Sequence, residues 1–479
     1  MAQIKKNWLK LLSQEEIESI HQASMQVLTE VGIRLEDREL TEELLDSGCS
    51  KKDDRIRFAS ALIEKALSGL QKELTFGCRS GKRVYLQDGS VFTHPGGSIP
   101  FVYDLFSGEK RNATLKDLSG MIKLMNTLDH LDMPGALICP DDIPPPMSEI
   151  RQSEMLFRHS MKPVSGSGVS SSRQASFILE LYRVLTDITE DGHRFPLMDV
   201  GISPESPLYY PQEIVDIMKA FIKEGIPTVP LVAPICGLTA PMTIAGGLTQ
   251  MNASMLVFAT LAHIINPKAP VIYGARLAFA NMVTGCSIWG LPEVGVAGAC
   301  SVQLARHYGF ASDVYGLSST SCASDNQLGY EKAINGIMPL LAGANVISGF
   351  GSYTSGFLAS FEQLLIDNET FAMMHKSAQG VTIDSDRLAV DAIANVMAGE
   401  NFMEQEHTMR YLRSGEIFIP RLGADGLLDD YEAAGSKDIR ERARDEAKRR
   451  LKSYEDAPLP PEADREFVRI IAAAEAELL

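Results

Sequence analysis

From about Thr114 onward the sequence repeats one pattern: a helix, a short apolar strand, a loop rich in Gly and Pro, and the next helix. Strands that alternate with helices pair in parallel through right-handed crossovers, and strands buried on both faces read as continuous apolar runs. The pattern therefore predicts an α/β fold. The predicted strands are Gly135–Cys139, Pro163–Gly166, Leu197–Ile202, Thr228–Val232, Pro270–Gly274, Asp313–Gly316 and Asn345–Gly349.

Seven strand–helix units favour a closed TIM (β/α)₈ barrel. The sequence does not fix an eighth strand. Ser98–Asp104 is a candidate, and without it an open doubly wound sheet remains as the alternative, although no GxGxxG follows the first strand. The predicted helices are Ser148–His159, Gln174–Leu185, Pro211–Glu224, Met242–Ile264, Pro292–His307, Asp325–Leu341 and Ala359–His375.

The first hundred residues read differently and predict a helix-plus-hairpin cap over residues 1–113. Ser13 to Glu16 form a capping box, and an apolar stripe then runs to Gly32, which suits positive φ beyond a helix end. Further helices are predicted around Leu40–Asp46 and Ser60–Gly69. Asp88-Gly89 predicts a hairpin turn between Val84–Leu86 and Val91–Thr93.

The C-terminal part of the chain predicts a helical extension. We place the barrel core at residues 114–380 and the extension at residues 381–479. A strongly charged helix is expected over Ser436–Tyr454, followed by a last helix over Pro461–Leu479. This extension is expected to serve packing and interaction rather than chemistry.

Composition excludes several function classes. A formal net charge of −17 argues against binding to nucleic acid or an anionic membrane, so a small molecule or another protein is the expected partner. The N-terminus lacks the apolar stretch of a signal peptide, and later apolar runs are interrupted before roughly 20 residues, which predicts a cytoplasmic protein. The seven cysteines lack CxxC spacing and the nine histidines show no HxH or HExxH, so no metal site is predicted.

In a TIM barrel the chemistry lies just after the strands, and this rule nominates candidate residues. Tyr273 is placed to face a cation, Arg276 follows it, and Glu293 opens the next helix as a counter-charge. The plainer interpretation of Glu293 is a favourable charge on the helix dipole. Two further loops qualify: the hydroxyl-rich stretch of residues 317–327, in which Asp325 could be a simple helix cap, and the aromatic stretch of residues 349–357.

Several motifs carry a resemblance that extends over nearly the whole chain. They are Pro292-Glu293-Val294-Gly295, the stretch from Asp325-Asn326-Gln327 to Lys332, Leu341-Ala342-Gly343-Ala344-Asn345, and Ser360-Phe361-Glu362-Gln363 with the residues that follow as far as Asn368. In this order and spacing they resemble the trimethylamine:corrinoid methyltransferase family. In that family pyrrolysine occupies the loop that here contains Ser318. The chain therefore resembles the branch without pyrrolysine, whose activities include demethylation of glycine betaine and related quaternary amines.

The resemblance implies that the chain moves a methyl group from a quaternary amine, such as glycine betaine, proline betaine, carnitine or γ-butyrobetaine, to the Co(I) of a separate corrinoid protein. It implies no tightly bound cofactor here, because the partner carries the corrinoid, and it leaves a homo-oligomer open. Ser318 and Glu293 are assigned as catalytic. The predicted substrate site combines aromatic rings for the cation with polar groups for a carboxylate: His94, Phe101, Tyr103, Tyr273, Arg276, Gln327, Tyr353 and Phe357.

Two other functions stay open. A betaine-binding sensor or scaffold that has lost methyl transfer would keep the same cation site. A metal-assisted lyase or hydrolase would keep the barrel, but the sequence shows no ligand spacing for it.

Overall fold

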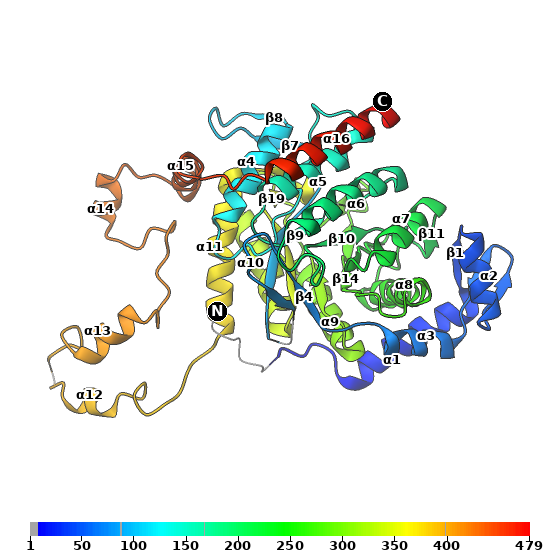
Figure 1. The fold of residues 1–479 in the computed structure, drawn as a ribbon. Coiled ribbons are helices and arrows are strands. Elements are labelled where there is room, and N and C mark those ends of the chain that lie inside the picture. Colours follow the sequence, from blue (N-terminus) through cyan, green and yellow to red (C-terminus); the bar gives the residue numbers. More distant parts are fainter. Residues whose placement is uncertain (1–7, 87–88, 167, 398) are drawn as a thin grey trace.

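Two parallel sheets form the centre of the molecule (Figure 1). The computed structural model describes residues 8–86, 89–166, 168–397 and 399–479. One sheet has the order β12-β10-β9 and the other the order β14-β17-β18-β6. Their strands are β9 (Val164–Gly166), β10 (Met198–Ile202), β12 (Thr228–Pro230), β14 (Tyr273–Ala275), β17 (Ser312–Val314), β18 (Val346–Phe350) and β6 (Phe92–Pro95).

Isolated backbone contacts link the two sheets at both edges. On one side Thr228 bridges Val271 in parallel, and the Ile272 amide donates to the Thr228 carbonyl at 3.0 Å. On the other side residues 133–135 lie between β6 and β9. The Met133 amide donates to the Thr93 carbonyl at 3.0 Å, and Gly135 bridges Ser165 in parallel.

Helices follow the central strands in alternation and pack against their neighbours in sequence. All seven helices predicted for this region are confirmed, with ends that agree to within three residues. The regular alternation of apolar runs and capped helices accounts for this agreement. The seven helices are α5 (Ser148–His159), α6 (Ser172–Asp187), α7 (Gln212–Lys223), α8 (Ile244–Ile265), α9 (Pro292–Tyr308), α10 (Asn326–Ala342) and α11 (Phe361–Ala378), and α4 (Leu115–Asn126) precedes them.

The strand predictions are correct except near the start of the chain. Six of the seven predicted strands overlap a strand of the central sheets, which in three cases extends one residue beyond the predicted range, whereas Gly135–Cys139 makes only single bridges at Gly135 and Ile138. The candidate Ser98–Asp104 contains β7 (Phe101–Tyr103), but β7 lies in a separate sheet of order β19-β20-β7-β8. That sheet also holds β8 (Lys110–Asn112), β19 (Ser352–Tyr353) and β20 (Leu358–Ala359).

The predicted hairpin between Val84–Leu86 and Val91–Thr93 is wrong. β5 (Val84–Leu86) pairs antiparallel with β4 (Leu74–Phe76), while β6 pairs in parallel with β18, more than two hundred residues later. Of the predicted turn, Asp88 lies outside the described residues. A local turn signal could not reveal that β6 pairs with a strand far away in the sequence.

The N-terminal segment contains the predicted helices. α1 (Gln14–Gln26) begins with the capping box, in which Ser13 accepts from the Glu16 amide and Glu16 accepts from the Ser13 amide. A π-helical turn (Val27–Val31) follows, and Gly32 has a φ of 75° at its end. The remaining elements here are β1 (Ile33–Leu35), α2 (Arg38–Asp46), β2 (Ser50–Lys52), β3 (Arg55–Arg57) and α3 (Ser60–Gly69); β11 (Tyr209–Tyr210) completes their sheet.

One helix corrects the expectation that every apolar run is interrupted early. α8 is 22 residues long and apolar enough to cross a membrane by length and composition. However, 72% of its most apolar window is buried within the protein, and it packs against α1 and α3. These contacts are those of a core helix.

Beyond α11 the chain forms an extension that returns to the body near its end. α15 (Ile439–Lys452) packs along α11, and α16 (Pro461–Leu478) packs on α6 and α5. Both predicted C-terminal helices are thus confirmed. Between α11 and α15 lie three short helices, α12 (Val390–Ala394), α13 (Glu406–Arg413) and α14 (Leu428–Ala433).

Candidate active site

A cavity of about 360 Å³ opens where the central strands end. Every strand of the central sheets except β14 contributes to its wall, including His94 from β6, Ser165 from β9, Asp199 from β10 and Ser348 from β18, and Arg276 follows β14. The linking segment of residues 133–135 and its continuation also take part, through Gly135 and Ala136. The volume is at the small end of the range for ligand pockets, which favours a small molecule.

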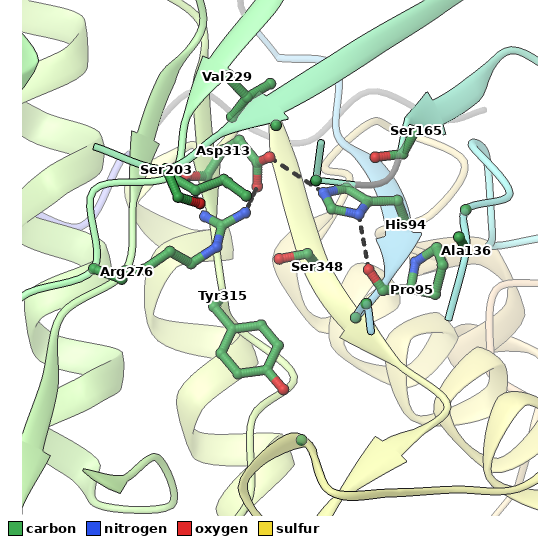
Figure 2. Close-up of a pocket in the computed structure, with 18 of the residues that line it drawn as sticks. His94, Pro95, Ala136, Ser165, Ser203, Val229, Arg276, Asp313, Tyr315 and Ser348 are labelled. Atoms are coloured by element: carbon green, nitrogen blue, oxygen red, sulfur yellow. Dashed lines mark hydrogen bonds and ion pairs between the residues drawn. The ribbon is translucent and has the colours of Figure 1, made fainter. Parts of the chain in front are cut away.

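A buried ion-pair network crosses this cavity (Figure 2). Arg276 follows β14, and its Nη2 donates to Asp313 Oδ1 at 2.8 Å, while Nη1 donates to the Asp313 carbonyl at 2.8 Å. His94 approaches the other carboxylate oxygen, with Nε2 3.2 Å from Asp313 Oδ2. The Asp313 side chain is 2% exposed, and burial alone would raise its pKa. Arg276 and His94 outweigh burial and hold that pKa at about 2.

The two ring nitrogens of His94 have different partners. Nδ1 lies 2.8 Å from the Pro95 carbonyl oxygen, and Nε2 lies 3.2 Å from Asp313 Oδ2. Carbonyl and carboxylate oxygens accept hydrogen bonds, so these contacts orient the imidazole ring. The cavity therefore holds the Arg276 guanidinium and the His94 ring on the two oxygens of one carboxylate.

A second carboxylate, Asp199, lines the same cavity without an ion-pair partner at salt-bridge distance. The Gly166 amide donates to its Oδ1 at 3.1 Å. Burial, the largest cause, and the charge of Asp313 raise the pKa of Asp199 to about 7, although His94 opposes them. The net charge of the cavity thus depends on pH near neutrality.

Two aromatic rings line the cavity close to Arg276. Trp289 and Tyr315 meet edge to face, with ring centroids 5.2 Å apart and planes at 83°. The Tyr315 hydroxyl oxygen lies 3.2 Å from the Ser352 hydroxyl oxygen. These rings offer π faces to a cation beside the ion-pair network.

Ser318 fixes the backbone of Trp289 rather than lining the cavity. Its hydroxyl donates to the Trp289 carbonyl at 2.8 Å, and Asn335 donates to the same oxygen at 3.2 Å. Gln327 does not line the cavity either, and its side-chain amide donates to Glu331 at 2.7 Å. Glu331 in turn accepts from Ser319 and from the Thr320 amide.

A buried lysine anchors the loop that follows β18. Lys332 Nζ lies 2.7 Å from Asp367 Oδ2, and the two side chains are 2% and 0% exposed. The same Asp367 oxygen accepts from the Gly351 amide, and Lys332 also donates to the Gly349 carbonyl. The pair thus ties α10 and α11 to the loop leading toward Ser355 and Gly356, which line the cavity.

The structure brings only some of the predicted site residues together. His94 and Arg276 meet at Asp313 in the cavity, as Figure 2 shows. Tyr273 points into the core, where its hydroxyl donates to Asn252 at 2.9 Å and burial raises its pKa well above the ordinary value. Glu293 is exposed in the first turn of α9, and Asp325 caps α10 by accepting from the Leu328 amide.

The remaining predicted aromatic residues lie away from the cavity. Tyr103 and Tyr353 stack with centroids 6.1 Å apart, and Phe101 packs in the same small apolar cluster beside Leu328 and Leu358. Phe357 follows the cavity-lining Gly356 but is 58% exposed. The structure therefore replaces the predicted rings with Trp289 and Tyr315.

Sequence reasoning did not select Asp199, Asp313, Trp289 or Tyr315. A signal existed for the carboxylates, because each interrupts an otherwise apolar predicted strand, and a charge inside a buried strand has to be paired or functional. Among the described residues, no group of three or more His, Cys, Asp or Glu side chains has an arrangement suited to a metal ion.

Known proteins resemble this chain over nearly its full length. A trimethylamine methyltransferase MttB of Desulfitobacterium hafniense (strain DSM 10664 / DCB-2) is 28% identical over 469 residues, covering 97% of this chain and 94% of that protein. A glycine betaine methyltransferase of Desulfitobacterium hafniense (strain Y51) is 28% identical over 465 residues, with 96% of each chain covered.

Solved structures show a related fold. The monomethylamine methyltransferase (MtmB) of Methanosarcina barkeri aligns with a TM-score of 0.51 at 12% identity, over 94% of this chain and 90% of that one. A hydroxylamine complex of MtmB aligns with a TM-score of 0.52 at 13% identity, with the same coverage.

The family model described as "Trimethylamine methyltransferase (MTTB)" matches residues 2–478. The predicted family and the predicted enzyme class, a methyltransferase, are confirmed by this match and by the names of the relatives. The chain that carries this cavity belongs to the trimethylamine methyltransferase (MTTB) family.

Proposed function

We propose that this protein transfers a methyl group from a small quaternary amine of the betaine type to the Co(I) of a separate corrinoid protein. The released product is the tertiary amine that lacks one methyl group. The observation that carries the proposal is the cavity itself, which places the Arg276 guanidinium and the rings of Trp289 and Tyr315 around a space for a small ligand. The glycine betaine methyltransferase among the relatives supports the choice of substrate class.

We infer that the central strands form a closed (β/α)₈ barrel. The two sheets and the segment of residues 133–135 provide eight neighbouring strand positions, and backbone contacts link the ring at both junctions. The likeness in fold to MtmB supports this inference. Such a barrel explains why residues far apart in sequence meet at one end of the molecule.

The cation of the substrate lies against Trp289 and Tyr315 in this proposal. An edge-to-face pair leaves the π face of one ring open, and each cation–π contact contributes on the order of 0.5–2 kcal/mol when water is excluded. Ser318 and Asn335 hold the Trp289 backbone in place. In this chain Ser318, at the position that matches pyrrolysine in the resembling family, is thus a positioning residue.

The carboxylate of the substrate lies toward His94 and Arg276. Arg276 is cationic, and it shares the Asp313 carboxylate with the His94 ring. Asp199 affects the charge of the cavity, because its protonated form adds no negative charge against an anionic group. Charge-assisted hydrogen bonds of this kind are stronger than neutral ones.

The reaction requires alignment more than proton transfer. The electron pair of the breaking C–N bond moves to nitrogen, which leaves as a neutral tertiary amine, so no residue has to donate a proton. The Co(I) of the corrinoid protein, a co-substrate, supplies the electron pair of the new bond to the methyl carbon. The residues of this chain hold the cation in line with the cavity mouth and exclude water.

A panel of substrates, assayed with the wild-type protein and one variant, tests the proposal. The purified protein and a reduced corrinoid protein are mixed with glycine betaine, proline betaine, carnitine, γ-butyrobetaine or tetramethylammonium, and methyl-cobalt absorbance and the demethylated amine are measured. We expect turnover of at least one betaine. Arg276→Gln should lower kcat/KM for that betaine about 10- to 100-fold and affect tetramethylammonium less, since the latter has no carboxylate.

Two outcomes would contradict the proposal. Binding of betaines by calorimetry without turnover, across several corrinoid proteins, would identify a sensor or scaffold instead. An equal loss of activity toward both substrates in Arg276→Gln would remove the carboxylate role assigned to Arg276.

A further inference from the structure

Most of the segment of residues 381–428, here called the arm, lies apart from the body of the protein. The arm contacts α11 near its end, where Lys376 donates to the Gly415 carbonyl and Glu369 accepts from the amides of residues 421–423. In Figure 1 it leaves the end of α11, passes through α12 and α13 in gold and orange, and returns through α14 to α15. None of the described residues from 379 to 421 is buried, and α12, α13 and α14 contain no buried residue. The arm thus has no hydrophobic core of its own.

The arm is nevertheless rich in exposed apolar side chains. About half of the large apolar side chains that are exposed in the described structure belong to it, although it is about a tenth of the chain. Val390, Ile393 and Met397 are 68%, 60% and 72% exposed and lie at helical spacing in and after α12. The others are Val381, Ile383, Leu388, Phe402, Met403, Met409, Leu412, Ile417, Ile419, Leu427 and Leu428.

Polar contacts give the arm a defined local shape. Asp386 accepts from Arg410 Nη2 at 2.7 Å and from the Tyr411 hydroxyl, and Arg387 pairs with both Asp384 and Glu416. These contacts join the segment before α12 to α13 and the residues just after it. Ordering a segment of chain costs conformational entropy. Because the arm is ordered but buries little apolar surface of its own, we expect it to pack against the apolar surface of another molecule, which offsets that cost.

The body of the same chain offers such a surface on α10 and α11, which pack side by side. Tyr330 and Ile334, four residues apart on α10, are 57% and 44% exposed, and Met373 on α11 is 53% exposed. The arm of the same molecule leaves all three side chains uncovered. We call these residues the α10–α11 face.

We propose that the arm of one molecule covers the α10–α11 face of a second copy of this chain, and that two copies exchange arms about a two-fold axis. Every copy carries both the arm and the face, so one symmetric pairing covers both surfaces at once. A stable interface buries roughly 800 Å² per partner, and many exposed apolar side chains together, as the arm carries them, are needed to supply such an area.

A second copy of this chain is a better candidate partner for the arm than the corrinoid protein is. None of the residues that line the cavity belongs to the arm, and a protein that presents an atom to the cavity must cover its mouth. The mouth is formed by the strand ends and by the loops near Arg276, Trp289 and Ser355. The arm pairing therefore does not depend on the proposed reaction.

Sedimentation velocity of the full chain tests the proposal. We expect the wild-type protein to be dimeric, or a multiple of a dimer, at micromolar concentration. The variant Val390→Asp/Ile393→Asp should raise the dimer dissociation constant on the order of 100-fold or more, because it places charges in the covered surface. The variant Tyr330→Asp/Ile334→Asp, on the other half of the contact, should do the same.

Controls separate dissociation from misfolding. Val468→Asp on α16 changes a similarly exposed residue, 58% against 68% for Val390, and should leave the dimer intact. Circular dichroism should be the same for all variants. A mixture of the arm variant and the face variant should partly recover association, since one of the two contacts in the mixed dimer is wild-type on both sides.

Three results would overturn the proposal: a monomeric wild-type protein, arm variants that remain dimeric, or no recovery in the mixture. If arm variants stayed dimeric but lost binding to the corrinoid protein, the arm would be a docking surface for that partner and not for a second copy.

Discussion

The two tryptophans of the chain lie in different surroundings and provide a matched pair of substitutions. Trp289 lines the cavity, whereas Trp8 packs near the N-terminus with the Arg306 guanidinium 4.7 Å above its ring. Trp289→Leu should lower kcat/KM for the preferred quaternary amine about 3- to 30-fold, because one cation–π contact is lost. Trp8→Leu should leave kcat/KM unchanged. Steady-state assays of both variants make the comparison, and equal effects would contradict a cation site at Trp289.

Asp199 should make substrate binding depend on pH. Its pKa is raised to about 7, so the side chain is neutral below that pH and negative above it. The negative form repels a substrate carboxylate held by His94 and Arg276. The KM for a betaine should therefore rise as pH increases from about 6 to about 8.5, and the KM for tetramethylammonium should not rise. Asp199→Asn should flatten the betaine profile; an unchanged slope would assign the titration to another group.

Two of the predicted site residues, His94 and Arg276, lie in the cavity, and the reason that others do not is geometric. His94 was selected because it follows the predicted hairpin, and Arg276 because it follows an apolar run. Tyr273 was selected by the same rule, but Tyr273 and Arg276 are three positions apart and so point to opposite sides of an extended chain. Strands buried on both faces show no polar alternation that would reveal which side faces a cavity.

At the scale of the elements, the buried Lys332–Asp367 pair holds α10, α11 and the loop after β18 together. Burial lowers the pKa of Lys332 and raises that of Asp367. Lys332→Met should cost about 3–5 kcal/mol in the free energy of unfolding, because it leaves an unpaired buried carboxylate.

An ion pair exposed at the surface provides the control for Lys332→Met. Lys437→Met removes the partner of Asp445 at the surface and should leave the unfolding midpoint unchanged within error. The double variant Lys332→Met/Asp367→Leu should recover most of the loss, as measured by denaturant unfolding. A small effect of Lys332→Met alone would show that the pair contributes little to stability.

The sequence predicted seven of the helices around the strands to within three residues at each end. It did not predict the order of the strands. Helix ends are marked locally, by caps such as Ser360 and by Gly343 in the left-handed conformation after α10. The pairing of β6 with β18 depends on contacts between residues more than two hundred positions apart. No local pattern near Phe92 distinguishes this strand from half of a hairpin.

At the scale of the whole molecule, the arm should determine sensitivity to proteases. If a second copy covers it, limited trypsin digestion should leave the wild-type arm intact, although it contains exposed basic residues such as Arg410 and Arg413. The dissociated variant Val390→Asp/Ile393→Asp should be cut there first. Mass spectrometry of the early fragments locates the cuts. Rapid cutting of the wild-type arm under the same conditions would argue against coverage.

The parallel pairing of β6 with β18 has a consequence for how the protein is made. During synthesis, residues 92–95 leave the ribosome early, but their partner strand emerges only after roughly three quarters of the chain has been translated. Until then β6 lacks its partner strand β18 and leaves a strand edge that other nascent chains could bind. We expect this protein to need chaperone protection during translation, and truncated chains that end before residue 346 to aggregate.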